Sequence, residues 1–231
     1  MFEDHRIGVV IPALNEADAI GNVIRAIPGW VDVIVVGDNG STDATAEVAR
    51  AAGAVVVIQT ERGYGAACLA ALAALPPVDI VVFVDGDYSD YPEDMADLVA
   101  PIARATSDFV LGSRTMGDAE RGSLTPQQRF GNWLATTLIA WIWRQRYTDL
   151  GPYRAIRKTA LDRLAMADRN YGWTVEMQIK AAEQKLRILE VPARYRRRIG
   201  ISKVSGTVKG TIMAGYKILS IIGRYALSSR R

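Results

Sequence analysis

The sequence predicts an α/β domain built on a mostly parallel sheet with helices on both faces. Four apolar runs rich in β-branched residues, at 7–11, 31–36, 54–58 and 80–84, alternate with helix-compatible stretches at 17–26, 42–52 and 65–75. This alternation is typical of parallel α/β sheets. The runs are apolar throughout rather than at every second position, which indicates strands covered on both faces.

The second half of the chain is less regular. We expect a helix at 127–143, a turn at 150–152, a helix at 175–184, a strand at 187–191 and an amphipathic helix in the tail. The apolar stretch 133–143 begins and ends in tryptophan and is followed by Arg144 and Arg146. It is either a buried core helix or a helix at a membrane interface.

Length and composition favour one domain at 1–203 followed by a tail at 204–231, because no linker rich in Gly, Ser or Pro divides the chain. The one cysteine, Cys68, excludes an internal disulfide, and the one histidine, His5, excludes zinc sites with several histidines. No apolar run reaches the roughly 18 residues that a membrane span needs. Since no secretory signal fits before the first strand, we expect a cytoplasmic protein.

Charge is distributed unequally along the chain. The first 120 residues contain 6 Lys and Arg against 19 Asp and Glu, whereas residues 121–231 contain 22 against 6. We therefore expect the first half to hold a cation and the second half to hold anions. The aromatic residues of the basic half lie in apolar stretches rather than among the basic residues, so nucleic acid is not an expected partner.

Polar segments follow three of the predicted strands, at 12–16, 38–43 and 85–87. Because ligands gather at the carboxyl ends of parallel strands, these segments should form one pocket. Asp38 stands directly after its strand, where a carboxylate can accept hydrogen bonds from a nucleotide. Residues 38–43 also fit a turn followed by a helix capped by Ser41 or Thr42.

Asp85-Gly86-Asp87 places two carboxylates close together at a strand end. Like charges this near repel unless a cation or proton lies between them, and carboxylate oxygens suit Mg²⁺ or Mn²⁺. An isolated Asp-Gly-Asp is more often a solvated turn. Its position after an apolar strand favours a metal site formed by Asp85 and Asp87.

Taken together, these motifs resemble family 2 glycosyltransferases, and within them the dolichol-phosphate and polyprenyl-phosphate hexose synthases. The resemblance covers residues 7–205 and rests on several motifs in order: Pro-Ala-Leu-Asn-Glu at 12–16, Asp-Asn-Gly-Ser-Thr-Asp at 38–43, Arg-Gly-Tyr-Gly at 62–65, Asp-Gly-Asp at 85–87, Gly-Ser-Arg at 112–114, Thr-Asp at 148–149 and Tyr-Arg-Ala at 153–155. It implies a GT-A fold, a nucleotide-sugar donor, a Mg²⁺ or Mn²⁺ cofactor and inversion at the anomeric carbon.

The resemblance also implies roles for individual residues. Asp87 would bind the metal that bridges the donor diphosphate, and Asp85 would contact ribose or metal. Arg114 and Asp149 join Asp87 as catalytic candidates. The remaining donor-binding candidates are Pro12, Leu14, Asn15, Glu16, Asp38, Asn39, Arg62, Gly63 and Gly86.

The basic half of the chain indicates what the acceptor is. The resemblance implies that an acceptor lipid phosphate is held by Arg114, Arg129, Arg198 and Lys203, and guanidinium groups offer the forked, permanently charged donors that a phosphate needs. A phosphate is already largely ionised at neutral pH, whereas a sugar hydroxyl would need a general base. Asp149 or Glu176 would be that base. Alternatively, the arginines at 194, 196, 197 and 198 form a solvated strand face.

The tail predicts a cationic amphipathic helix. At 100° per residue, Lys209, Lys217 and Arg224 fall within about 80° of one another. The opposite side holds Ile218, Leu219, Ile222, Tyr225 and Ala226. Such a helix either docks on its own domain or lies on an anionic membrane.

The leading hypothesis is a metal-dependent inverting hexosyltransferase that uses a UDP-sugar, or GDP-mannose, and polyprenyl phosphate at the inner face of the cell membrane. One alternative keeps the donor chemistry with a soluble or glycan hydroxyl acceptor. Another is a nucleotide-sugar-binding or membrane-adaptor protein without turnover. The oligomeric state does not follow from the residues.

Overall fold

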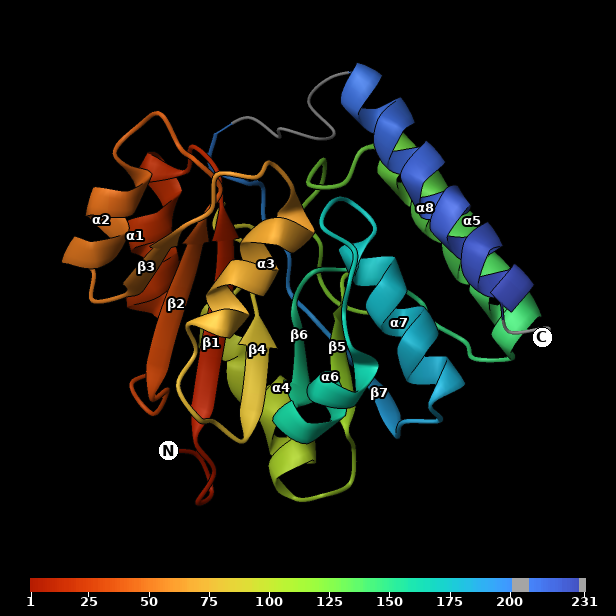
Figure 1. Ribbon diagram of the computed structural model, residues 1–231, viewed down its shortest axis with the longest axis horizontal. Coiled ribbons are helices and arrows are strands. Elements are labelled where there is room, and N and C mark those ends of the chain that lie inside the picture. Colours follow the sequence, from red (N-terminus) through yellow and green to blue (C-terminus); the bar gives the residue numbers. More distant parts are fainter. Residues whose placement is uncertain (201–207, 229–231) are drawn as a thin grey trace.

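The computed structural model describes residues 1–200 and 208–228, which form a seven-stranded sheet between two layers of helices (Figure 1). The strand order is β3-β2-β1-β4-β6-β5-β7. The strands are β1 (Ile7–Ala13), β2 (Val33–Asp38), β3 (Val55–Ile58), β4 (Ile80–Phe83), β5 (Phe109–Ser113), β6 (Arg154–Arg157) and β7 (Ile188–Pro192).

The sheet is mostly parallel, as predicted. Strand β6 alone among these seven runs against its neighbours β4 and β5, while the other pairings are parallel. In the register of β1 and β2, Ala13 lies opposite Asp38, so both strands end at the same level. The polar segments that follow β1, β2 and β4 therefore leave the sheet at one edge.

Helices cover both faces and bury two separate apolar clusters. Helices α1 (Ala17–Ala26), α2 (Thr45–Ala51) and α4 (Met95–Ala103) contribute to one cluster. The other cluster receives side chains from α3 (Tyr64–Ala73), α5 (Pro126–Trp143), α6 (Lys158–Leu164), α7 (Trp173–Glu183) and α8 (Val208–Ser228). A short 3₁₀ helix, η1 (Pro92–Asp94), precedes α4.

The predicted elements agree with the structure to within a few residues at their ends, but β3 differs in its burial and several elements were missed. Strand β3 is an edge strand, and Val55 and Ile58 are each 51% exposed rather than covered. The apolar pattern did not predict the strands β5 and β6, the helices α4 and α6 or the short helix η1. Strand β6 contains Arg154, which is fully buried and donates hydrogen bonds to the carbonyl oxygens of Leu150 and Thr174, so its sequence lacks the signature of a core strand.

The tail forms the predicted helix. Helix α8 lies beside α5 and packs on the domain (Figure 1), burying Ile221 and Ile222. Docking on its own domain is therefore the observed arrangement. Lys203 and the side chain of Lys209 lie outside the described residues. Among the described helices, none combines the length and apolarity needed to cross a membrane.

Candidate active site

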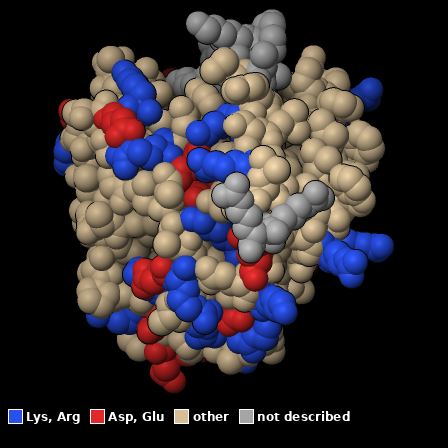
Figure 2. All heavy atoms as spheres, turned by 45° about the vertical axis from the view of Figure 1, so that its right-hand side comes forward, with Lys and Arg blue, Asp and Glu red and all other residues tan. Residues whose placement is uncertain are grey.

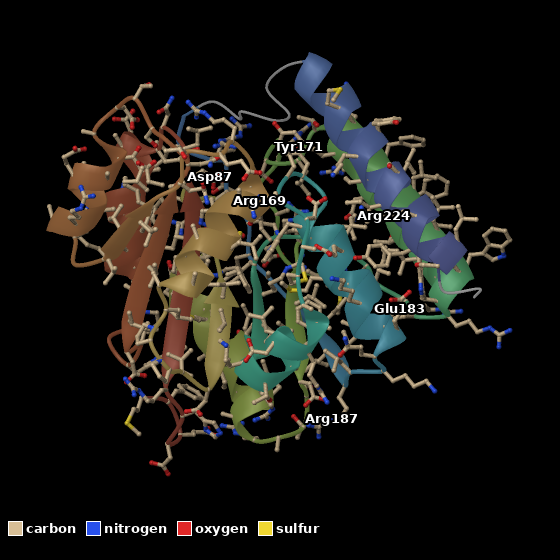
Figure 3. All side chains as sticks on the ribbon, in the orientation of Figure 1. Asp87, Arg169, Tyr171, Glu183, Arg187 and Arg224 are labelled. Carbon is tan, nitrogen blue, oxygen red and sulfur yellow. The ribbon has the colours of Figure 1, made fainter. Side chains whose placement is uncertain are left out.

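A cavity of about 350 Å³ lies at the carboxyl ends of β1, β2 and β4. Ten of the predicted site residues line this cavity, which we call the donor cavity: Pro12, Leu14, Glu16, Asn39, Arg62, Gly63, Asp85, Gly86, Asp87 and Arg198. A Cβ atom on Gly86 would make ordinary van der Waals contact with Ala13 and Ile20, at 3.4 Å. Figure 3 shows Asp87 at this end of the sheet.

Asp85 and Asp87 are held in place by neighbouring hydroxyl and amide groups. Asp85 Oδ1 accepts a hydrogen bond from the Tyr64 hydroxyl at 2.9 Å. Asp87 Oδ1 accepts one from the Ser89 backbone N–H at 2.9 Å and one from the Ser89 hydroxyl at 2.5 Å. Partial burial and the charge of Asp87 together raise the pKa of Asp85 to about 7. The pair therefore carries unfavourable negative charge that a divalent cation would neutralise.

Asp90 adds a third carboxyl group beside this pair. Its side chain is buried, and its Oδ1 atom has no hydrogen-bond partner. Burial, followed by the charges of Asp85 and Asp87, raises the pKa of Asp90 well above its usual value, whereas Arg114 opposes the shift.

Arg198 joins the basic half of the chain to this acidic corner. Its guanidinium lies 3.2 Å from Asp87 Oδ2 and 2.8 Å from Glu16 Oε1. Arg194 similarly pairs with Asp94 at 2.6 Å, and Arg196 stacks on the rings of Tyr88 and Tyr91 at 3.7 Å. Arg194, Arg196 and Arg198 therefore reach the acidic half of the chain. Arg197 donates to the Arg121 carbonyl oxygen instead, and it is exposed, as is Arg194.

Three residues that were predicted to contact the nucleotide sugar form hydrogen bonds within and between the loops: Asn15, Asp38 and Asn39. Asn15 Oδ1 accepts the Thr42 backbone N–H at 2.8 Å, and Asp38 Oδ1 accepts that of Ser41 at 3.1 Å. The Asn39 amide donates to the Glu61 carbonyl oxygen and accepts the Gly63 N–H, both at 2.7 Å. Asn39 lines the donor cavity, whereas Asn15 and Asp38 are not among its lining residues.

One wall of the donor cavity was not predicted from the sequence. Asn170 and Tyr171, in the loop between α6 and α7, line it beside the glycine motif at 62–65. A Cβ atom on Gly63 or Gly65 would lie within 2.0 Å of a backbone oxygen of this loop. These glycines therefore allow two backbones to approach closely, which the motif alone does not reveal.

A second cavity, of about 800 Å³, lies between the β5 end and α5. We call it the acceptor cavity. Arg114, Arg129 and Asp149 line it, as predicted site residues, together with Arg146 and Trp133. The charge of Arg114 also opposes the rise in the pKa of Asp85 and of Asp90.

Arg114 and Asp149 form the best-defined ion pair at this site. Asp149 Oδ2 accepts the Arg114 backbone N–H at 2.9 Å and the Nε–H at 2.7 Å, while Oδ1 accepts the Nη2–H at 2.7 Å. The Asp149 side chain is 1% exposed. Burial raises the pKa of Asp149, but the charge and hydrogen bonds of Arg114 outweigh this effect and leave the pKa below its ordinary value.

Comparison with known proteins identifies the family. Residues 8–165, more than half of the chain, match the model of Glycosyl transferase family 2. The chain belongs to glycosyltransferase family 2.

Relatives and a solved structure agree with this membership. An uncharacterized glycosyltransferase of Mycobacterium tuberculosis is 37% identical over 90% of this chain and 94% of its own length. A dolichyl-phosphate hexose transferase of Haloferax volcanii is 33% identical over 88% and 87%. The crystal structure of glucosyl-3-phosphoglycerate synthase from M. tuberculosis, in complex with Mn²⁺, UDP and glucosyl-3-phosphoglycerate, superimposes with a TM-score of 0.74 at 26% identity and covers 95% of this chain and 81% of that one. The fold is GT-A, as the resemblance implied.

Within this glycosyltransferase, the carboxylates of both predicted bases are engaged by neighbouring groups. Glu176 is fully buried, lines neither cavity, and is bound by Lys180 at 2.8 Å and by the Tyr225 hydroxyl at 2.9 Å. Asp149 lines the acceptor cavity, but Arg114 engages both of its oxygens. A lowered pKa also makes a carboxylate a weaker base.

The Arg114–Asp149 pair predicts a pH-dependent stability change. Arg114→Met should lower the free energy of unfolding by about 3 kcal/mol or more at pH 7, because it leaves a buried carboxylate unpaired. Asp149 has a lowered pKa in the folded wild type, so its contribution is present above about pH 4 and is lost as the pH falls through that lowered pKa. The difference between variant and wild type should therefore shrink in acid.

Urea unfolding at pH 7 and at pH 3.5 measures this difference. Arg104→Met, which breaks the exposed surface pair with Glu3, serves as the control and should cost less than about 1 kcal/mol. An equal loss for Arg114→Met at both pH values would contradict the assignment.

The acidic corner fits a divalent cation. Mg²⁺ in enzymes of this kind is usually bound by one or two carboxylates, with substrate phosphate oxygens and water completing the shell. Asp85 and Asp87 supply two such groups on one cavity wall. Among the described residues, no cluster of three or more His, Cys, Asp or Glu side chains is arranged to hold a metal ion.

Proposed function

We propose that this family 2 glycosyltransferase moves a hexose from a nucleotide sugar to a polyprenyl phosphate, with inversion at the anomeric carbon. A UDP-sugar is the favoured donor and GDP-mannose the second candidate. The donor assignment is supported by the UDP and Mn²⁺ in the solved relative, and the acceptor by the dolichyl-phosphate relative.

The observation that carries the acceptor proposal is the lining of the acceptor cavity. Three arginines line it, and its one described carboxylate, Asp149, is engaged by Arg114. A hydroxyl acceptor would need a base there, whereas a phosphate monoester, with a second pKa near 6, arrives already ionised. Cationic walls and no free base are what a phosphate nucleophile requires.

Asp85 and Asp87 would hold Mg²⁺ or Mn²⁺ in the donor cavity. The ion would supply positive charge to the nucleoside diphosphate as it leaves. Arg198, between Asp87 and Glu16, brings a second cationic group to the same corner. The Tyr64 hydroxyl orients Asp85, and Ser89 orients Asp87.

A polyprenyl acceptor requires access to a membrane, and we assign this contact to the outer faces of α5 and α8. Phe130, Trp133 and Trp141 on α5, and Tyr216 and Leu227 on α8, are 59–79% exposed. Neither helix contains an Asp or Glu residue. Figure 2 shows a broad tan area on this side with blue side chains at its margin. An apolar surface flanked by cations suits the anionic inner face of the cell membrane.

Trp133 lines the acceptor cavity and also belongs to this exposed surface, where its ring lies 5.8 Å from that of Phe130. A polyprenyl chain could therefore leave the cavity over Trp133 and enter the lipid. We expect Trp133→Ala combined with Trp141→Ala to weaken binding to vesicles containing phosphatidylglycerol about tenfold or more, because two interfacial aromatic anchors are lost.

Vesicle co-sedimentation measures this change. Ile58→Ala, which removes an exposed apolar side chain from the edge strand β3, should leave vesicle binding unchanged. Equal binding of wild type and double variant would exclude the α5–α8 face as the contact.

Transfer of radiolabelled sugar from each common nucleotide sugar into an organic-extractable, mild-acid-labile product tests the function as a whole. The signal should require Mg²⁺ or Mn²⁺ and an added polyprenyl phosphate. Absence of such a product with every donor would overturn the lipid acceptor.

The second candidate keeps the donor and replaces the lipid by a soluble phosphorylated hydroxyl acceptor. It is favoured by the ligand of the solved relative, glucosyl-3-phosphoglycerate. If Asp149 were the base, Asp149→Asn should abolish transfer to such an acceptor, so retained transfer would exclude that role. A binding protein without turnover would bind nucleotide equally well without metal and after Asp87→Asn.

A further inference from the structure

The loop between α6 and α7 forms one wall of the donor cavity and is held from behind by α8. Asn170 and Tyr171 line the cavity. On the side of α3, the loop accepts hydrogen bonds from the Gly65 N–H to the Asn170 carbonyl at 3.3 Å and from the Ala66 N–H to the Arg169 carbonyl at 2.9 Å. Figure 3 shows Tyr171 and Arg169 between α3 and α8.

Asp168 determines the shape of this loop. Its Oδ1 atom accepts the backbone N–H of Asn170 at 2.8 Å and that of Gly172 at 3.0 Å. Its own N–H donates to Glu176 Oε2 at 2.7 Å. The side chain lines neither cavity and is 2% exposed. Asp168 therefore acts on the donor cavity through Asn170 and Tyr171 rather than by touching a ligand.

The charge of Asp168 is paired from α8. Asp168 Oδ2 lies 2.9 Å from Lys217 Nζ, and the Lys217 side chain is 38% exposed. A buried carboxylate that loses its cationic partner is strongly unfavourable and moves toward water. Such a movement would disturb the hydrogen bonds that fix residues 170–172. The packing is also tight here, because a Cβ atom on Gly172 would overlap Ile221 of α8.

We propose that the Asp168–Lys217 pair couples the seating of α8 to nucleotide binding, with Asp168 as a positioning residue for the donor. Helix α8 carries both the contact to this loop and part of the exposed apolar face. When α8 is held in place on the domain, Asn170 and Tyr171 are ordered at the donor cavity. When α8 shifts, these two residues lose that order. The proposal rests on the proposed function in one respect, namely that the donor cavity binds a nucleotide.

The test compares UDP binding in the presence of Mn²⁺, by isothermal titration calorimetry, in the full chain. Lys217→Met should weaken UDP binding about fivefold or more relative to wild type. Lys217→Arg keeps the positive charge and should bind UDP as tightly as wild type. Arg224→Met removes a basic residue from the same helix, where the guanidinium lies over Tyr225, and should leave binding unchanged. In transfer assays, the KM for the donor should rise while kcat changes less than twofold.

Hydrogen exchange gives a second measurement that needs no nucleotide. In Lys217→Met, the amides of Asn170 and Gly172 should exchange faster, while those of β1 should stay protected. Asp168→Asn keeps an oxygen to accept these bonds and should have a smaller effect on exchange than Lys217→Met.

The outcomes separate the two proposals. If UDP does not bind, the same titration is made with GDP, and wild-type protein that binds neither nucleotide with Mn²⁺ would overturn both the donor assignment and the coupling. Normal UDP binding that is unchanged by Lys217→Met would overturn the coupling alone. An Arg224→Met variant as impaired as Lys217→Met would also overturn it, because the effect would then reflect general loosening of α8.

Discussion

Asp87→Asn is expected to lower kcat/KM for sugar transfer about a thousandfold, equivalent to about 4 kcal/mol of transition-state stabilisation. The substitution removes one negative charge from the proposed metal site. It keeps an oxygen that can still accept the Ser89 N–H, so the loop after β4 should keep its conformation. Initial rates at saturating Mn²⁺, together with the melting temperature, measure the two effects separately.

Asp97→Asn is the matched control for Asp87→Asn. Asp97 is an exposed carboxylate on α4, in the element that follows the same loop. Its substitution changes the net charge by the same amount and should leave kcat/KM unchanged. An Asp87→Asn enzyme that retains more than a tenth of wild-type activity would exclude Asp87 as a metal ligand in catalysis.

Arg129→Met and Arg146→Met should each raise the KM for polyprenyl phosphate about tenfold, and the double variant should raise it about a hundredfold. Each substitution removes a charge-assisted hydrogen bond to phosphate, worth about 1.5 kcal/mol or more. Both side chains are exposed at the acceptor cavity, so the melting temperature should stay within about 2 °C of wild type. The KM for the nucleotide sugar should not change.

Arg163→Met, on the exposed side of α6, is the control for non-specific loss of positive charge. It should leave the KM for both substrates unchanged. If the double variant has a normal KM for polyprenyl phosphate, the acceptor phosphate does not bind in this cavity. Arg114 is unsuitable for this test because its loss also leaves the buried carboxylate of Asp149 without its cationic partner.

Hydrophobic patterning predicted the first half of the fold well. The apolar runs at 7–11 and 80–84 are strands β1 and β4, and the stretch at 17–26 is helix α1. These elements are long, regular and buried, so local sequence and tertiary burial favour the same conformation. Strand β6 was missed because four residues containing two arginines have no strand pattern, and its position depends on pairing with β4 and β5.

The candidate site was predictable where a motif follows a strand. Asp85 and Asp87 follow β4, and Glu16 lies just beyond β1, so the edge of a parallel sheet brings them to one cavity. Arg146, Asn170 and Tyr171 line the two cavities without belonging to any motif. Their positions depend on how α5 and the α6–α7 loop pack, and that packing is formed by contacts distant in sequence.

By itself, the sequence determined the fold class, the carboxylate pair at a strand end and the family, because each depends on residues that are close together in the chain. Only the tertiary structure decided which charges act together. Arg198 meets Asp87, Arg114 neutralises Asp149, and Lys217 neutralises Asp168. The physical reason is that the interaction of two charges depends on their distance and burial, and chain folding fixes both.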